Sequence, residues 1–352
     1  MSPRQASLQT DLVRTGFVDA KNAGARIQDL VDGALAGLLD PGDFGVAADP
    51  DRALQMLTDL TSDNPDGVRH VLGDPGHKAR LLSLLGLSES LGDFLRRYPE
   101  YVVAVTDDST QGARGRILAA LAAENPMLGL RVAYRRELVG VAARDLCGEA
   151  SLETTMTQLT DLADAALQGC YELAVREVGE AAAAVDLAVI AMGKCGAREL
   201  NYISDVDVVF VAEPRTPEVP AQVALRAGQQ IASRLMQIAN AATSEGSIWE
   251  VDAALRPEGK AGALVRTIDS YVAYYRKWAK TWEFQALLKA RPAAGNLDLG
   301  ARYVDSVVDF VWTAADRENF VDDVQAMRRR VEAHIPEKQA AASVGQAHLM
   351  AA

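Results

Sequence analysis

The sequence predicts an α+β fold, with a helical N-terminal region, a small sheet and C-terminal helices. Three observations point to it. From residue 7 to about residue 176, Leu, Ala and Val recur at spacings of three and four, as they do along amphipathic helices. At Val185 short runs of β-branched and aliphatic residues replace this spacing, which is typical of buried strands. From Thr267 the helical spacing returns, so we expect the middle of the chain to form the sheet.

Turn-forming residues divide the N-terminal region into separate helices. Proline occurs with glycine, aspartate or asparagine at residues 41–42, 64–67, 74–76 and 125–126. Because proline is tolerated only in the first turn of a helix, we expect helix boundaries at these places. Helices that pack on other helices account for the whole region.

Three short segments read as strands of one small core. The long helix expected between the second and third of them covers about 221–242. The strands are expected at Val185 to Met192, Val206 to Ala212 and Ser247 to Ala253.

One further helix is predicted from Thr267 to Leu288. An aromatic stripe at helical spacing is more often core than binding site, so we interpret its Trp residues and Gln285 as buried. Later helices are expected from Leu299 to about 315 and from Glu318 to His334, before a tail of low complexity. The residues expected to share one face of the first helix are Tyr274, Trp278, Trp282, Gln285 and Lys289.

The composition excludes several classes of function. The 352 residues carry 36 Lys and Arg against 48 Asp and Glu, and the net charge of −12 argues against binding nucleic acid through its phosphates. No apolar run is long enough to span a membrane, and the N-terminus lacks the apolar core of a signal peptide. The three cysteines, Cys147, Cys170 and Cys195, lack metal-ligand spacing. We therefore expect a cytoplasmic protein with reduced thiols.

A pair of aspartates at the start of the second strand is the most informative feature. Asp205 and Asp207 are two residues apart, so their carboxylates are expected on the same face of the sheet. Two like charges held that close repel one another unless a cation lies between them, and oxygen ligands suit Mg²⁺. For an isolated Asp-x-Asp motif, a solvated strand edge is the alternative interpretation.

Two neighbouring features make phosphoryl or nucleotidyl transfer a concrete hypothesis. Gly193 and Lys194 follow the first strand in a turn where backbone N–H groups and a lysine can approach a phosphate. Asp252 lies in the third strand, which as a neighbour would bring a third carboxylate to the same metal. A Walker A loop is excluded because neither Lys194 nor Lys260 is followed by Ser or Thr. No GxGxxG or GxSxG motif is present either.

These motifs resemble those of a known family. The family is that of the glutamine synthetase adenylyltransferase and adenylyl-removing enzymes, a branch of the nucleotidyltransferase superfamily. The resemblance covers about Asp186 to Gly295, and the helical N-terminus fits more loosely. The chain departs from the family pattern at Ala254, where many relatives carry a second arginine, and at Cys195, where an aliphatic residue is usual. The three matching blocks are GKCGARELNYISDVDVVFV, VDAALRPEGKAGALVRT and YYRKWAKTWEFQALLKARPAAG.

The resemblance implies a domain organisation. Enzymes of this family are roughly twice to three times as long, with two nucleotidyltransferase domains, and this chain resembles the N-terminal half. It implies a helical N-terminal region over 1–150 and a mixed-sheet nucleotidyltransferase catalytic domain over 151–297. C-terminal helices and a truncated tail would follow over 298–352.

The resemblance also implies an activity and its partners. The expected reaction is Mg²⁺-dependent, phosphorolytic removal of AMP from an adenylylated tyrosine of glutamine synthetase. Forward adenylyl transfer from ATP and a catalytically silent regulatory fragment are the alternatives. Glutamine synthetase is then the protein substrate, phosphate, ADP or ATP are the small ligands, and a PII-type signalling protein is a further candidate partner.

Site residues follow from the matched motifs. Asp205, Asp207 and Asp252 are expected to be catalytic and to hold the metal. Residues expected to bind nucleotide or phosphate are Gly193, Lys194, Ser204, Arg256 and Lys289.

Several of these residues have a second interpretation. Ser204 either bonds a phosphate oxygen or satisfies backbone groups of its own loop. Glu199 either orients Lys194 or Arg198, or forms an ordinary surface ion pair with Lys194. Lys289 and the nearby Arg291 either reach the site or pair with the end of the preceding helix.

Overall fold

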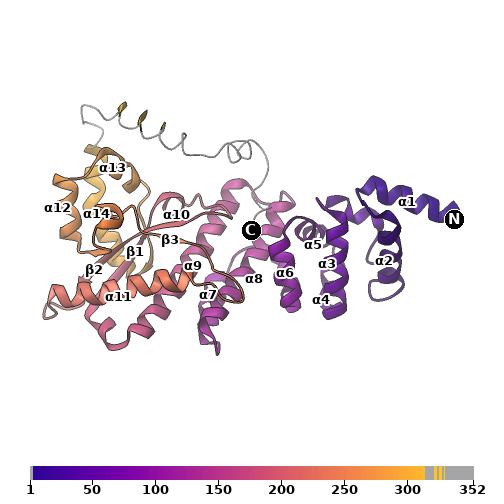
Figure 1. The fold of residues 1–352 in the computed structure, drawn as a ribbon, viewed down its shortest axis with the longest axis horizontal. Coiled ribbons are helices and arrows are strands. Elements are labelled where there is room, and N and C mark those ends of the chain that lie inside the picture. Colours follow the sequence, from indigo (N-terminus) through magenta and orange to yellow (C-terminus); the bar gives the residue numbers. More distant parts are fainter. Residues whose placement is uncertain (1–2, 314–320, 323–324, 327–328, 330–352) are drawn as a thin grey trace. The chain divides into compact units, whose positions relative to one another are not determined.

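The structure is a computed structural model that describes residues 3–313, 321–322, 325–326 and 329 (Figure 1). Contacts within the chain separate two compact units, one of residues 3–111 with 135–158 and one of residues 112–134 with the described residues from 159 onward. The domain limits expected from the sequence stay a prediction. The helix expected over Glu318 to His334 and the tail lie largely outside the described residues. None of the described helices is both long and apolar enough to cross a membrane.

The first unit is helical, as predicted, and six of the eight helical elements described in residues 3–111 begin at a proline. Asn64 accepts a hydrogen bond from Gly67 N at 3.0 Å, and Asp74 accepts one from His77 N at 2.9 Å. Each cap is followed by proline at the first helical position, where a missing N–H costs nothing. Its elements are α1 (Pro3–Thr15), α2 (Ala20–Asp32), η1 (Pro41–Val46), α3 (Pro50–Asp63), α4 (Pro65–Leu72), α5 (Pro75–Leu87), α6 (Glu89–Arg97) and η2 (Pro99–Thr106).

Along the sequence, further helical segments follow η2 and precede the first strand of the sheet. They are α7 (Ala113–Ala119), η3 (Ala120–Ala122), α8 (Pro126–Leu146), α9 (Leu152–Val178) and η4 (Gly179–Ala184). The expected boundary at residues 125–126 is confirmed, because α8 begins at Pro126.

The second unit contains a five-stranded mixed sheet in the order β3-β2-β1-β5, with β4 also pairing with β2. The pairs β1–β2 and β1–β5 are antiparallel, whereas β3 and β4 run parallel to β2. This confirms the α+β fold with a small mixed sheet. The strands are β1 (Val185–Ala191), β2 (Val206–Pro214), β3 (Val251–Asp252), β4 (Val265–Arg266) and β5 (Arg291–Gly295).

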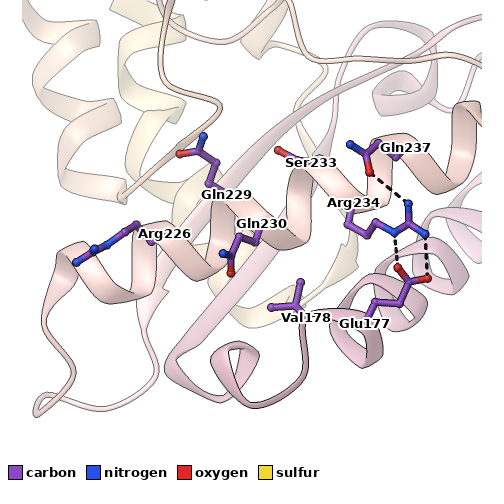
Figure 2. Close-up of a pocket in the computed structure, with 8 residues that line it drawn as sticks. All are labelled: Glu177, Val178, Arg226, Gln229, Gln230, Ser233, Arg234 and Gln237. Carbon is purple, nitrogen blue, oxygen red and sulfur yellow. Dashed lines mark hydrogen bonds and ion pairs between the residues drawn. The ribbon is translucent and has the colours of Figure 1, made fainter.

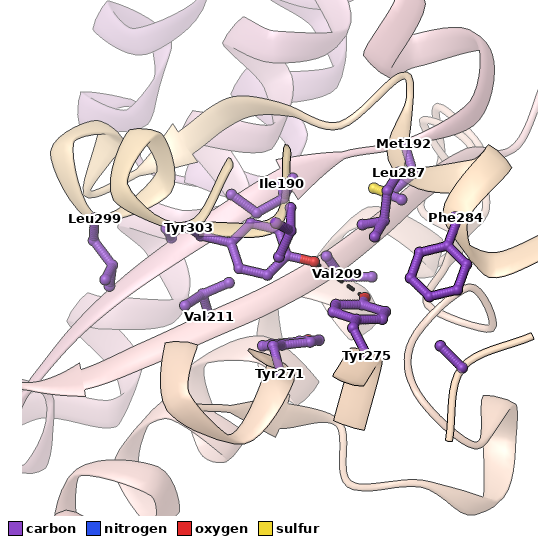
Figure 3. Packing of buried hydrophobic residues seen from close by; sticks show 13 residues of the cluster. Ile190, Met192, Val209, Val211, Tyr271, Tyr275, Phe284, Leu287, Leu299 and Tyr303 are labelled. Atoms are coloured by element: carbon purple, nitrogen blue, oxygen red, sulfur yellow. Dashed lines mark hydrogen bonds between the residues drawn. The ribbon is translucent and has the colours of Figure 1, made fainter. Parts of the chain in front are cut away.

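Helices cover both faces of this sheet. The helix α11 (Ala221–Asn240) packs on β1 and β2, and Gly228 lets it approach Ala212 and Leu187 closely. The other face packs against α12 (Ile268–Lys277), α13 (Thr281–Leu287) and α14 (Leu297–Thr313). Figure 3 shows the apolar cluster on that face, in which the hydroxyl groups of Tyr275 and Tyr303 are hydrogen-bonded at 3.2 Å. Tyr271 OH donates to Phe210 O at 3.1 Å. Successive residues on this face of β2 are Val211, Val209 and then Asp207.

Three expectations from the sequence are corrected. The third strand is only two residues long, because residues 247–250 make no ladder of their own, and the strands β4 and β5 were missed. The helix expected from Thr267 to Leu288 is interrupted at Trp278 to Lys280, where Lys280 N donates to Glu283 Oε2 at 2.8 Å and starts α13. Trp278 is the residue that caps the end of α12, and its side chain is 65% exposed instead of buried.

Candidate active site

The two parallel strands β2 and β3 bring the predicted carboxylates together. Asp207 and Asp252 are direct register partners, and paired residues of neighbouring strands project from the same face of a sheet. Asp205 precedes Asp207 by two residues, just before β2 begins. Asp252 Oδ1 also accepts a hydrogen bond from Ala254 N at 2.7 Å, which orients its carboxylate.

The charges of these carboxylates influence one another. Burial, first, and then the negative charges of Asp252 and Asp205 raise the pKa of Asp207 to about 6, against the opposing effect of Lys194. In the described part of the chain, no three Asp, Glu, His or Cys side chains converge closely enough to hold a metal ion. Asp207 and Asp252 are thus neighbours on one face of the sheet, but in this structure the three aspartates do not close into a metal-binding cluster. Their all-oxygen donor set fits a hard divalent cation better than any softer metal.

A short helix at the end of β1 lies against Asp207. It is α10 (Gly193–Ala197), and Met192 N just before it donates to Asp207 O at 2.8 Å. Gly193 has a φ of 53°, and a Cβ there would collide with Asp207 Oδ2. Only glycine allows this approach, since other residues disfavour this backbone conformation. The sequence predicted a glycine turn here, and in the structure the residues from Gly193 onward form the short helix α10.

The basic residues around α10 have different surroundings. Lys194 is exposed and its charge acts on Asp207. Glu199 pairs with Lys289, with Nζ and Oε2 2.7 Å apart, and Arg198 pairs with Asp161 at 2.6 Å. The alternative in which Glu199 pairs with Lys194 or orients Arg198 is therefore wrong. Lys289 reaches the loop after α10, and nucleotide binding by Lys289 stays a prediction.

Two other predicted phosphate ligands make contacts within their own loops. Ser204 Oγ donates to Asp205 O at 3.0 Å. Arg256 donates through Nε to Gly262 O at 3.1 Å, through one terminal nitrogen to Ala253 O at 2.6 Å and through the other to Lys260 O at 3.0 Å. These bonds shape the loop between β3 and β4, and they use three of the five N–H groups of the guanidinium. Phosphate binding by Ser204 and Arg256 stays a prediction.

Sequence reasoning missed a set of polar contacts between α9, β5 and α10. Arg291, in β5, pairs with Asp164 of α9 instead of extending from a helix end. Asp161, Asp164 and Gln168 lie on one face of α9, at spacings of three and four in an otherwise apolar stretch. That spacing of polar residues in a buried helix was the available signal.

A polar hollow of about 710 Å³ lies elsewhere on the second unit (Figure 2). It is lined by the outer face of α11 and the end of α9, where Arg234 pairs with Glu177. Because α11 covers the face of the sheet opposite to Asp207, this hollow is separate from the carboxylates.

Comparisons with known proteins agree with these motifs. The sequence model of the glutamate-ammonia ligase adenylyltransferase family matches residues 78–306. A protein of Streptomyces coelicolor is 48% identical over 96% of this chain and 35% of its own length, and one of Streptomyces avermitilis is 44% identical over 95% and 34%. A protein of Mycolicibacterium smegmatis is 44% identical over 82% and 30%. Each is named bifunctional glutamine synthetase adenylyltransferase/adenylyl-removing enzyme.

The chain thus spans about a third of the length of these relatives. The family model covers most of the chain, including both strands that carry the aspartates. The chain belongs to the glutamate-ammonia ligase adenylyltransferase family.

Proposed function

We propose that this chain is a metal-dependent nucleotidyltransferase that acts on glutamine synthetase. The observation that supports it most is the register pairing of Asp207 with Asp252, beside Asp205 and against Gly193. The negative charges of Asp252 and Asp205 raise the pKa of Asp207, and carboxylates held this close on one face of a sheet favour a divalent cation. The names of the relatives supply the protein substrate.

The direction we propose is phosphorolytic removal of AMP. The chain resembles the N-terminal half of the family's enzymes, to which that direction is attributed. An oxygen of inorganic phosphate attacks the phosphorus of tyrosyl-AMP, and the bond from phosphorus to the tyrosine oxygen breaks. The proton of the phosphate ends on the tyrosine, and ADP is the second product.

The residues would divide the work as follows. Asp205, Asp207 and Asp252 would hold the metal, for which we propose Mg²⁺, and their side chains would have to move closer together than they lie in this structure to do so. When bound, the ion supplies positive charge to the phosphoryl oxygens. Gly193 keeps the backbone of α10 close to the Asp207 carboxylate. Lys194 adds a positive charge beside the attacking phosphate. Positioning and charge neutralisation are enough for this class of reaction, which asks little covalent chemistry of a protein.

The test is turnover of adenylylated glutamine synthetase by the wild-type chain and by Asp205→Asn and Asp207→Asn. We expect ADP to form from phosphate in the presence of Mg²⁺, and each variant to lose about a hundredfold or more in rate. Arg215→Gln is a control, because Arg215 pairs with Asp186 at the opposite end of β1.

Other outcomes would contradict the proposal. Consumption of ATP with AMP transfer to unmodified glutamine synthetase identifies the forward reaction. Absence of metal-dependent product in both directions identifies a regulatory or binding fragment. A PII-type signalling protein remains a predicted partner, to be tested by its effect on either rate.

A further inference from the structure

Arg291 stands where β1 passes into α10. It is the first residue of β5 and the register partner of Ala191, the last residue of β1. The next residues along the chain from Ala191 are Met192 and Gly193, which contact Asp207. The backbone of Arg291 is thus two residues away, across the sheet, from the glycine that lies against the carboxylate.

The guanidinium of Arg291 joins two elements. Its two terminal nitrogens donate to the two carboxylate oxygens of Asp164 on α9, at 2.7 and 3.0 Å. One of these nitrogens also donates to Cys195 O at 3.1 Å, and Nε donates to Gly196 O at 3.4 Å. Those carbonyls belong to α10, so one planar group connects α10 to the middle of α9. A lysine could not make this set of contacts, because its ammonium lacks the fixed fork.

Two further contacts from the same face of α9 support this arrangement. Asp161 pairs with Arg198, directly after α10, and Gln168 Oε1 accepts a hydrogen bond from Gly295 N at the end of β5. Together with Asp164, these residues hold both α10 and β5. We call the three α9 residues, Asp161, Asp164 and Gln168, the α9 polar face.

The short helix depends on these contacts for its position. An isolated helix of five residues is far below the length that is stable by itself in water. It is also tightly confined, because a Cβ at Gly196 would collide with Lys289 O and would lie 2.7 Å from Ala191 O. A small displacement of α10 therefore moves Gly193 and Lys194 relative to Asp207.

We infer that Arg291, held by Asp164, is a positioning residue that keeps α10 against Asp207. The side chain of Arg291 makes no hydrogen bond to Asp207 among the described residues. It acts through the backbone carbonyls of Cys195 and Gly196. The consequence for turnover rests on the proposed function, whereas the consequence for α10 does not.

The first test measures amide hydrogen exchange of residues 192–199 in Arg291→Gln and Asp164→Asn. We expect exchange in this segment to rise about tenfold or more, because local opening becomes easier when its fixed partners are lost. Arg215→Gln is the matched control, since Arg215 also donates to an aspartate and to a backbone carbonyl, Val185 O, but far from α10. It should leave exchange in 192–199 unchanged.

A second measurement separates positioning from general stabilisation. With adenylylated glutamine synthetase and phosphate, we expect kcat of Arg291→Gln to fall about a hundredfold with KM for the protein substrate nearly constant, as for a displacement of about 1 Å in a site. Arg291→Lys should not restore kcat, since the charge returns without the fork. If the Gln variant does not fold, the double variant Asp164→Asn/Arg291→Gln, which leaves no unpaired buried charge, takes its place.

These measurements distinguish positioning of α10 by Arg291 from general stabilisation of the fold. Unchanged exchange in residues 192–199, or full rescue of kcat by Arg291→Lys, overturns the inference. Raised exchange in a chain whose wild type shows no turnover supports the positioning of α10 and contradicts only the proposed function.

Discussion

The substitution Gly193→Ala tests the contact between α10 and Asp207 directly. Gly193 has a φ of 53°, a conformation that costs a residue with a Cβ about 1–2 kcal/mol. The added Cβ would also collide with Asp207 Oδ2 and lie 3.2 Å from its Cγ, so the carboxylate or the turn has to move by about 1 Å. A displacement of that size is expected to lower kcat by about a hundredfold.

Gly179→Ala provides the matched control for this substitution. Gly179 has a similar φ of 66°, but a Cβ there meets nothing within 4 Å. Both variants should lose similar stability in thermal unfolding from the backbone term, on the order of 1–2 kcal/mol. Only Gly193→Ala should also lose turnover of adenylylated glutamine synthetase. Equal activity of the two variants would refute the assignment of Gly193 and Asp207 to one site.

Three further predictions concern the charges of the site. Burial and two neighbouring carboxylates raise the pKa of Asp207 from 3.8 to about 6, so its contribution to folding stability is present below pH 3.8 and is lost as the pH rises through 6. In EDTA, Asp207→Asn should therefore unfold at a higher temperature than wild type at pH 7.5. The difference between the two melting temperatures should disappear toward pH 4. A difference that does not change with pH contradicts the raised pKa. Lys194→Ala should weaken binding of phosphate or ADP by about 1–3 kcal/mol, as measured by calorimetry, and unchanged affinity removes Lys194 from the site. Glu199→Gln frees Lys289 from its ion pair, so the affinity for phosphate should rise if Lys289 binds nucleotide and stay constant if it does not.

The sequence was most informative where chemistry and local pattern coincide. Proline beside glycine, aspartate or asparagine predicted the helix boundaries, and the run from Val185 predicted β1, because both signals are local. The Asp-x-Asp motif and its glycine turn predicted which residues meet at Asp207. That β3 runs parallel to β2 follows from pairing between segments 45 residues apart, which no local pattern encodes.

What escaped prediction depends on contacts between distant segments. The strand β5 contains Pro292 and two alanines, so it carries little strand propensity and forms because β1 offers an edge. The residues around Trp278 were expected on one face because the prediction treated 267–288 as one continuous helix. In the structure the hydrogen bond between Lys280 and Glu283 starts a new helix. Arg291 seemed to belong to a helix end, and its contacts with Asp164 became visible only through the tertiary fold.

The most direct measurement is product formation from adenylylated glutamine synthetase with inorganic phosphate as the only added nucleophile. The account predicts that Mg²⁺-dependent ADP appears in step with loss of AMP from the tyrosine, that EDTA stops it, and that Asp207→Asn lacks it. Release of AMP without phosphate, or ADP formation that persists in Asp207→Asn, would contradict the account.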